Sequence, residues 1–392
     1  MKVLFVSGYD LNGTNANVLC FRNVIEKIDK YNDIIIDVLG NSIFNEKSKK
    51  SWKTDPLTFV KRIIHWPAVD PNAIKKCKKL LLNYNLSEYD YIVVSHKPYE
   101  SVLAILKLKH KFLNAQIYLY ELDPMTNEID KKNGLGRYLF FLSIFKEKKM
   151  YKKVDRIFHM ESNRSKYTTQ KYKTYFKKFS YLDIPLLNFE ATKAKTKTQR
   201  SYNEVKFIYT GILNRVYRNP EYTLLLLNQL DNYDVKTKFI FNFFSKGDCE
   251  DIISKYCDNK SFVQHGYVDN DILNMYFNDA DFLINIGNHY SNMLPSKLLT
   301  YISKGKPIIH FSSKKDDPCL PYLDKYGPAL IIQESESLEK NLIKLFDFVH
   351  QNIGKCVNYN DILEKFVKNT AEWSAKQIIS QMRKDYVNGD KK

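Results

Sequence analysis

The chain of 392 residues is long enough for two domains of nearly 200 residues, each with its own core. A hydrophobic content of 44%, with 14% aromatic residues, excludes a disordered chain. The 61 Lys and Arg outnumber the 44 Asp and Glu, and the resulting formal charge of +17 indicates an acidic partner.

No apolar run approaches the roughly 20 residues that a transmembrane helix needs. The N-terminus carries one lysine before the short apolar run Val3 to Val6, which is typical of a first strand and not of a signal peptide. We therefore expect a cytoplasmic protein. The six cysteines show no C-x-x-C spacing and predict reduced structural thiols, with no zinc signature and no disulfide framework.

A first Rossmann-like domain is predicted over residues 1–187, because short apolar runs alternate with helical patterns there. The expected strands are Val3 to Ser7, Ile34 to Leu39, Tyr91 to Ser95, Gln116 to Tyr120, Arg156 to Met160 and Phe179 to Leu182. The expected helices include Ala16 to Ile28, Gly136 to Lys153 and Asn163 to Lys173. The loop after the first strand, Gly8 to Thr14, contains glycines but is neither G-x-G-x-x-G nor a Walker loop.

Two strand ends in this domain carry candidate catalytic residues. His96 follows the strand ending at Ser95, and Asp123 follows the strand ending at Tyr120. The carboxyl ends of strands form the ligand-facing edge of open α/β sheets, where a His and an Asp suit proton handling on a substrate hydroxyl. The alternative is that Asp123 caps a turn and His96 is a satisfied loop histidine.

The positive charge is concentrated between Lys146 and Arg200, where 16 Lys or Arg face 5 Asp or Glu, a net of +11. Nucleic acid, nucleotide-sugar phosphates and the anionic inner leaflet of a membrane all attract such a field. No nucleic-acid reading motif accompanies the charge, so we expect no nucleic-acid partner. Region 146–200 therefore either contacts the inner leaflet, helped by the aromatic and basic helix Gly136 to Lys153, or is merely solubilising.

Residues 188–204 lack apolar periodicity and predict an interdomain linker, followed by a second Rossmann-like domain over 205–370 and a last helical segment, 371–392. The first strand of that domain leads to Arg215, and the next ends near Lys246. Two D-x-D patterns, at 269–271 and 279–281, lie at helix ends and predict caps or surface groups, not a metal site.

The stretch Asp281 to Phe311 combines two buried strands, Phe282 to Ile286 and Pro307 to Phe311, with a loop and a short helix between them. Pro295 marks the first helical position, and Gly305 with Pro307 marks the stop. A helix start at a strand's carboxyl end offers N–H groups and a partial positive charge to a phosphate. The side chains that can add to this anion site are Ser291, Asn292, Ser296 and Lys297. The alternative is that the serines and the asparagine merely cap a helix start that any βαβ unit has.

The sequence PSKLLTYISKGKPII resembles the donor-site helix of GT-B glycosyltransferases, particularly the family 4, or group 1, enzymes of bacterial surface-polysaccharide synthesis. The matching positions are Pro295, Ser296, Lys297, Leu298, Tyr301, Gly305, Lys306, Pro307, Ile308 and Ile309. Many members of that family carry two glutamates eight residues apart, whereas Asn292 and Thr300 stand at the corresponding positions here.

The resemblance implies an α/β chain of the GT-B fold, with two Rossmann-like domains facing each other across a cleft and helix 371–392 crossing back to the first domain. It implies a hexosyltransferase that moves a sugar, most commonly from a UDP donor, to a glycan or lipid-linked acceptor for capsule or another surface polysaccharide. Such an enzyme retains the anomeric configuration and needs no metal or other cofactor. It would work in the cytoplasm or on the cytoplasmic face of the membrane.

By the same resemblance, His96 and Asp123 lie on the acceptor side, and no residue binds metal. The residues expected to bind the donor are Gly13, Thr14, Arg215, Lys246, Ser291, Asn292, Pro295, Ser296, Lys297, Leu298 and Thr300, with Arg218 as the reserve for Arg215. Two alternatives remain. A nucleotide-sugar 2-epimerase shares the architecture but needs acidic groups around the sugar, against which Asn292 and Thr300 argue. A non-catalytic glycosyltransferase-like subunit would bind sugar nucleotide without turnover.

Overall fold

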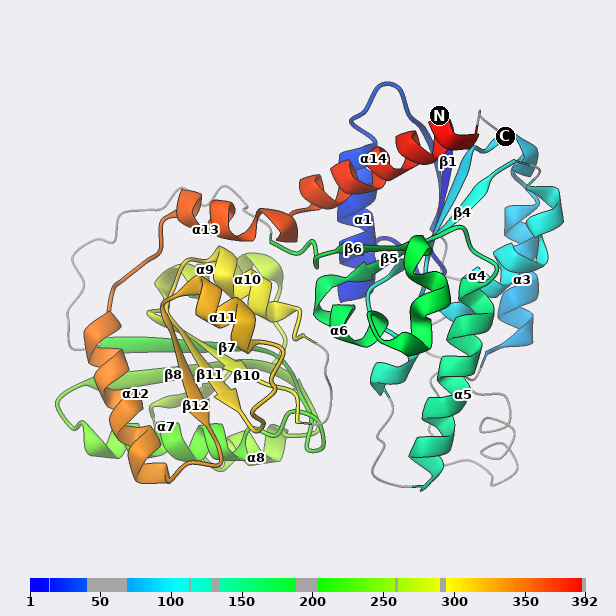
Figure 1. Cartoon of the computed structure of the whole chain (residues 1–392). Coiled ribbons are helices and arrows are strands. Elements are labelled where there is room, and N and C mark those ends of the chain that lie inside the picture. The colour runs from blue at the N-terminus through cyan, green and yellow to red at the C-terminus, as the bar shows by residue number, and fades with distance from the viewer. Residues whose placement is uncertain are drawn as a thin grey trace. The chain divides into compact units, whose positions relative to one another are not determined.

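The computed structural model describes residues 1–13, 15–40, 69–112, 114–128, 134–187, 204–257, 260–289 and 294–389. The chain divides into two compact units, the first formed by 1–186 together with 368–392, and the second by 187–367. Each unit is built on one parallel sheet flanked by helices (Figure 1). The predicted linker lies outside the described residues except for Glu204, which begins a strand.

The sheet of the first unit has six parallel strands in the order β2-β1-β3-β4-β5-β6. Its strands are β1 Lys2–Val6, β2 Ile35–Leu39, β3 Tyr91–Ser95, β4 Gln116–Glu121, β5 Arg156–Met160 and β6 Phe179–Leu182. These are the six strands expected from the apolar runs, within a residue or two at their ends. Parallel strands that are covered on both faces have nearly continuous apolar sequences, so their positions could be predicted from the sequence.

Helices cover both faces of this sheet. The helices are α1 Ala16–Ile28, α3 Pro71–Leu81, α4 Tyr99–Lys107, α5 Gly134–Tyr151, α6 Arg164–Tyr167 and α14 Ala371–Gly389, with short 3-10 segments η2 Leu86–Glu88, η3 Lys109–Lys111, η4 Met125–Glu128, η5 Glu161–Asn163 and η6 Gln170–Lys178. One core contains buried side chains of α3, α4 and α5, and the other those of α1 and α14. Helices α1 and α14 lie side by side (Figure 1).

The C-terminal helix α14 is fastened to this sheet by polar contacts as well as by its core face. Asp385 accepts three hydrogen bonds from the guanidinium of Arg156, at 2.8, 3.0 and 3.3 Å, and one from the Tyr118 hydroxyl. The Tyr91 hydroxyl donates to the carbonyl of Met382 at 2.6 Å. The predicted crossing of the last helix back to the first domain is therefore confirmed.

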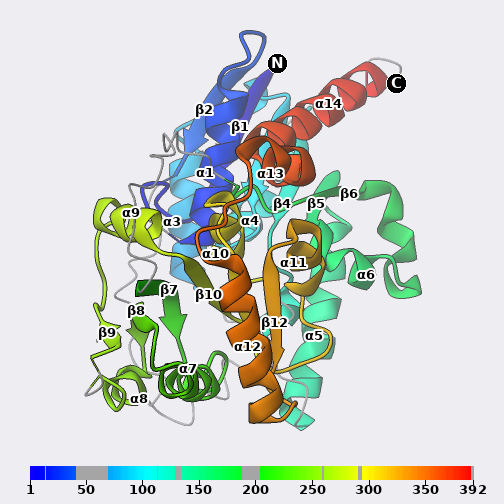
Figure 2. The same cartoon turned by 90° about the vertical axis from the view of Figure 1, so that its left-hand side faces the viewer.

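The second unit has a sheet of six parallel strands in the order β12-β11-β10-β7-β8-β9. The strands are β7 Glu204–Leu213, β8 Lys238–Gly247, β9 Phe262–Gln264, β10 Phe282–Ile286, β11 Ile308–Ser312 and β12 Ala329–Gln333. The helices are α7 Glu221–Tyr233, α8 Glu250–Ser254, α9 Asn270–Asp279, α10 Lys297–Ser303, α11 Leu320–Tyr326, α12 Leu338–Asn352 and α13 Tyr359–Phe366, before the 3-10 turn η7 Val367–Asn369. Helices α7 and α12 lie side by side over one face of the sheet (Figure 2).

Three helix predictions need correction. The helix expected from Pro295 begins at Lys297, because the Pro295 carbonyl accepts from the Leu298 N–H at 3.0 Å in a tight turn. The helix expected over 163–173 is split between α6 and η6, at threonines whose hydroxyls bond back to preceding carbonyls. The sequence pattern from Asn360 to Val387 predicts one continuous helix, whereas the structure divides it into α13 and α14. Within the described residues, no helix has the length and apolar character to span a bilayer.

Candidate functional site

The matched motif lies at the carboxyl end of β10, in the second unit. Leu298 is buried, whereas Ser296, Lys297 and Thr300 are half-buried. Burial, followed by the nearby charge of Lys304, lowers the pKa of Lys297 from its ordinary value. Ser296 occupies the N-cap position of α10 without a capping hydrogen bond from its side chain. The predicted Ser291 and Asn292 lie outside the described residues.

Tyr301 of the motif joins α10 to β7. Strand β10 pairs with β7 only as far as Ile284 opposite Tyr209, so the next residue, Thr210, has no strand partner on that side. The Tyr301 hydroxyl takes that place: it accepts from the Thr210 N–H at 2.8 Å and donates to the Thr210 carbonyl at 3.1 Å. Burial raises the pKa of Tyr301, which keeps the hydroxyl protonated as a donor. The two hydrogen bonds hold α10 in place against the end of β7.

Two other motif residues are structural. Gly305 has a φ of +70°, and a Cβ there would lie 2.9 Å from the carbonyl oxygen of Val357. Lys306 is buried, and its ammonium donates to the carbonyls of Asn278, at 2.9 Å, and Ala280. These carbonyls end α9, so the lysine serves as a C-terminal cap and not as a ligand-facing cation.

The two arginines after β7 take different places. A tight loop turns at Asn214, whose side chain accepts from the N–H groups of Val216 and Tyr217, at 3.0 and 3.1 Å. Arg215 consequently points to exposed Asp251 and donates to the Asp248 carbonyl at 2.9 Å. Because the chain doubles back, Arg218 lies at the edge of the sheet.

Arg218 contacts the carboxyl ends of two strands. Its guanidinium donates to the side chain of Asn288, just after β10, at 2.7 Å and to the carbonyl of Ile212 in β7 at 3.3 Å. The Nε of Arg218 is buried and makes no hydrogen bond within the described ranges. The structure thus brings Arg218, and not Arg215, to the strand end that precedes the motif. Lys246, at the end of β8, is exposed, with its ammonium 3.6 Å from the centre of the Tyr267 ring.

The two D-x-D patterns lie at the two ends of α9. Asp269 is the N-cap residue of α9, and Asp271 lies in its first turn. Asp279 pairs with the Lys206 ammonium at 2.8 Å, and Asp281 accepts from the Lys206 backbone N–H at 3.0 Å.

In the first unit, three titratable residues stand in a row across neighbouring strands. Glu121 is paired with His159 in the parallel register of β4 and β5, and Ser95 is paired with Tyr120, so His96 follows at the level of Glu121. The Glu121 carboxylate lies 3.6 Å from His96 Nε2 and 3.3 Å from His159 Nδ1. All three are at most 1% exposed.

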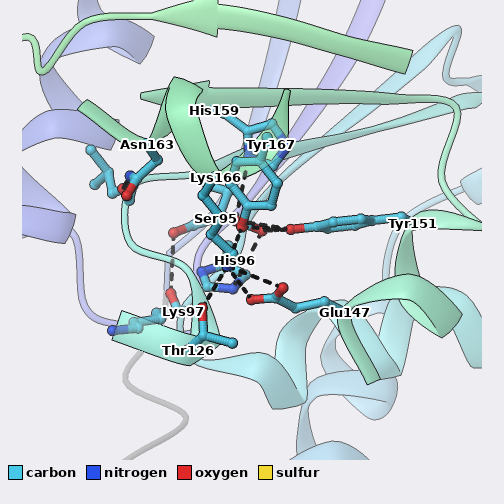
Figure 3. Close-up of polar contacts among 12 residues, drawn as sticks. Ser95, His96, Lys97, Thr126, Glu147, Tyr151, His159, Asn163, Lys166 and Tyr167 are labelled. Carbon is cyan, nitrogen blue, oxygen red and sulfur yellow. Dashed lines mark hydrogen bonds and ion pairs between the residues drawn. The ribbon is translucent and has the colours of Figure 1, made fainter. Parts of the chain in front are cut away.

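Tyrosines and a second carboxylate extend this row into a buried network (Figure 3). Glu121 accepts from the hydroxyls of Tyr151, at 2.8 and 2.9 Å, and of Tyr167. Lys166 reaches Glu147 at 3.1 Å. Because so many donors surround one oxygen pair, the network fixes the side chains at this strand edge in one arrangement.

The two carboxyls of the network have opposite pKa shifts. Burial acts to raise the pKa of Glu121, but His96, His159 and Lys166 more than offset it, so the pKa lies well below its ordinary value. Burial raises the pKa of Glu147 to about 6, since the single charge of Lys166 only partly compensates and Glu121 repels. Burial also lowers the pKa of His159.

The predicted catalytic pair is not brought together in this network. His96 belongs to it, but its carboxylate neighbour is Glu121, while Asp123 is half-buried two residues beyond β4. Gly13 closes a turn by donating from its N–H to the Asp10 carbonyl at 3.0 Å, and Thr14 lies outside the described residues. Sequence reasoning singled out neither Glu121 nor His159 as a site residue, although their positions at neighbouring strand ends were a signal.

Comparison with known proteins supports the architecture. No protein-family model and no curated protein sequence matches the chain. Sucrose-phosphate synthase from Thermosynechococcus elongatus matches with a TM-score of 0.65 and 12% identity, over 99% of each chain. The S. aureus MnaA–UDP structure matches with a TM-score of 0.55 and 11% identity, over 99% of this chain and 96% of that one. Apo WaaB, a lipopolysaccharide outer core galactosyltransferase, gives a TM-score of 0.54 and 10% identity, over 98% of this chain and 100% of that one. The GT-B fold expected from the motif is confirmed.

Proposed function

We propose that the chain is a glycosyltransferase that moves a sugar from a nucleotide diphosphate, with UDP as the nucleotide, to a glycan or lipid-linked acceptor. The observation that carries the proposal is the position of the P-S-K-L motif, at the carboxyl end of β10 in a chain of GT-B fold. Similarity to a galactosyltransferase and to a UDP-bound structure adds support. The biological setting we propose is capsule or other surface-polysaccharide synthesis in the cytoplasm.

The donor diphosphate is proposed to bind at the edge formed by β7 and β10. Arg218 is our first choice for the phosphate-binding cation, because its guanidinium already spans the two strand ends there and can bridge two phosphate oxygens. Lys297, half-buried at the start of α10, is the second cation. Together these charges stabilise the leaving diphosphate without a metal ion.

The acceptor is proposed to lie against the first unit. His96 would face the acceptor hydroxyl, with the Glu121 carboxylate 3.6 Å from Nε2 holding the imidazole. Asp123, Gly13 and Thr14 remain proposed contacts of the same side. We further propose retention at the anomeric carbon, with Asn292 and Thr300 hydrogen-bonding the donor.

A donor panel tests the function. The chain is incubated with UDP-, GDP- and dTDP-sugars and a lipid-linked acceptor, and nucleoside diphosphate release is measured without added Mg²⁺ or Mn²⁺. We expect release with UDP-sugar and acceptor only. Binding without turnover would replace the proposal with the non-catalytic subunit, and interconversion of the free sugar nucleotide would replace it with an epimerase.

Matched arginine variants test the phosphate site. Loss of a charge-assisted hydrogen bond costs about 1.5–3 kcal/mol, so Arg218→Ala should weaken UDP binding about 10- to 150-fold. Arg215→Ala is the control and should leave the affinity within about threefold, since its charge is paired with Asp251. UDP affinities are measured by calorimetry. A larger loss of affinity in Arg215→Ala than in Arg218→Ala would assign the phosphate-binding role to Arg215 instead.

We also propose that the first unit contacts the anionic inner leaflet through α5. Tyr138, Phe141 and Phe145 are 54, 65 and 63% exposed, and their spacing of three and four residues puts them on one face of the helix. The lysines near the end of α5 supply positive charge beside this aromatic stripe.

Vesicle sedimentation tests the membrane contact. The chain should sediment with vesicles containing anionic lipid, less so in high salt, and not with neutral vesicles. The double variant Phe141→Ser and Phe145→Ser should lose most of this binding, while Tyr233→Ser, at an exposed aromatic on α7, should keep it. Equal binding by both variants would refute a role for α5.

A further inference from the structure

A cavity with a volume of about 590 Å³ lies on the first unit, beside the C-terminal helix α14. Tyr31, in the turn that follows α1, lines it together with one face of α14. The α14 residues that line it are Lys376, Ile379, Ser380, Arg383, Lys384 and Val387. Small-molecule sites have volumes of about 300–1,000 Å³, so the cavity is large enough for a ligand.

Part of the lining is apolar. Ile379 is 2% exposed, and both Ile379 and the Tyr31 ring pack in the core that α1 and α14 share. Val387, about two turns further along the helix, is 56% exposed. Because burial of apolar surface is favourable, these side chains suit the apolar part of a ligand.

Three cations line the same cavity. Arg383 donates from one guanidinium nitrogen to Asp33 at 2.8 Å. Lys376 and Lys384 are exposed, and neither forms an ion pair or a hydrogen bond with any residue that the structure describes. The hydroxyls of Tyr31 and Ser380 are likewise without a hydrogen bond inside the described ranges. Donors of this kind can bind an anion.

The carboxylates that neighbour the two lysines in the helix are held by other partners. Glu372, one turn before Lys376, pairs with Lys27. Asp385, next to Lys384, accepts from the Arg156 guanidinium in the sheet. The positive charge of Lys376 and Lys384 is therefore not neutralised locally, which favours an anionic ligand.

A phosphate fits these cations better than a carboxylate does. A phosphate monoester carries a charge of about −1.5 to −2 at neutral pH, and its oxygens can be shared among several cations. A guanidinium bridges two phosphate oxygens, while each lysine ammonium adds a point charge. The apolar residues beside the cations favour an ester with an apolar or aromatic group.

We propose that the cavity binds a phosphate monoester of an aromatic or apolar group. The three cations hold the phosphate, and the apolar group lies against the Tyr31 ring and Ile379. The ligand bridges α14 to the turn after α1, so it stabilises the packing of the last helix on the first unit. The donor edge of β7 and β10 belongs to the second unit, so this site does not depend on the proposed function.

Nucleotides and lipid phosphates share this chemistry. In both views, α14 lies near one end of the first unit, whereas α5 extends toward the other (Figure 1 and Figure 2). A bilayer that contacts the aromatic stripe of α5 would therefore not reach the cavity. We expect a soluble nucleotide and not a lipid.

Fluorescence titration of the full chain with 1-naphthyl phosphate tests the site. The probe should bind more tightly than 1-naphthol or inorganic phosphate, each of which lacks one half of it. The double variant Lys376→Gln and Lys384→Gln should weaken binding about 5- to 30-fold, because each exposed charge contributes modestly. The control, Lys149→Gln with Lys173→Gln, removes two exposed lysines elsewhere in the first unit and should change the affinity by less than about twofold.

Competition distinguishes the two sources of the ligand. AMP should displace the probe, whereas displacement by dihexanoyl phosphatidic acid and not by AMP would identify a lipid phosphate. The proposal is overturned if the probe does not bind, if neither competitor displaces it, or if the double variant and its control bind equally. Loss of probe binding in Arg218→Ala would place the probe at the donor edge instead and would also overturn it.

Discussion

The hydroxyl of Tyr301 should be the main link between the motif helix and the sheet. Strand β10 stops pairing with β7 just before Thr210, and the Tyr301 hydroxyl satisfies both the N–H and the carbonyl of that buried residue. Tyr301→Phe keeps the ring in its core position but leaves a buried donor without its partner. An unsatisfied buried N–H costs about 1–3 kcal/mol.

Site-resolved hydrogen exchange is the appropriate assay, because a chain of two units need not unfold in one step. The expected cost corresponds to about 5- to 150-fold faster exchange of the Thr210 amide. The control is Tyr233→Phe on α7, whose ring is 58% exposed, and it should change exchange by less than about twofold. Equal protection of Thr210 in Tyr301→Phe and the wild type would refute the bridging role.

Three further changes test other parts of the structure. Gly247→Ala would put a Cβ 1.8 Å from the Leu213 carbonyl oxygen at a φ of +142°, so it should lower the free energy of unfolding by about 2 kcal/mol or more in urea titrations. Burial raises the folded pKa of Glu147 from 4.5 to about 6, so its contribution is complete below pH 4.5 and lost as pH rises through 6. The unfolding free energy of the wild type relative to Glu147→Gln should thus fall by about 2 kcal/mol between pH 4.5 and 7, and a pH-independent difference would contradict this. Lys306→Met should destabilise the second unit by about 1–3 kcal/mol, because it removes the cap of α9, whereas donor affinity in the folded fraction should stay unchanged.

The sheets could be predicted from sequence because each central strand is buried on both faces. Runs such as Tyr91–Ser95 and Phe282–Ile286 are buried throughout and mostly apolar. The motif's Gly305 and the position of α10 between β10 and β11 followed from the same reading. Local chemistry was sufficient wherever the deciding contacts were close in sequence.

The side chains of the candidate site were harder to predict, because their partners depend on strand order. His96, Glu121 and His159 meet only because β3, β4 and β5 are neighbours in register, which no local pattern states. The chain reverses direction in the tight loop at Asn214. Because of this reversal, Arg218 and not Arg215 reaches the sheet edge, where it donates to Asn288.

The discontinuous first unit has a consequence for how the protein is made. The ribosome delivers residues 187–367 as one continuous stretch, so the second unit can fold as soon as it leaves the exit tunnel. The first unit lacks α14 until the whole second unit has been synthesised, and during that interval the surface later covered by Ile378 and Met382 is open to water. We therefore expect chaperones to bind the nascent first unit at this exposed apolar surface before α14 covers it.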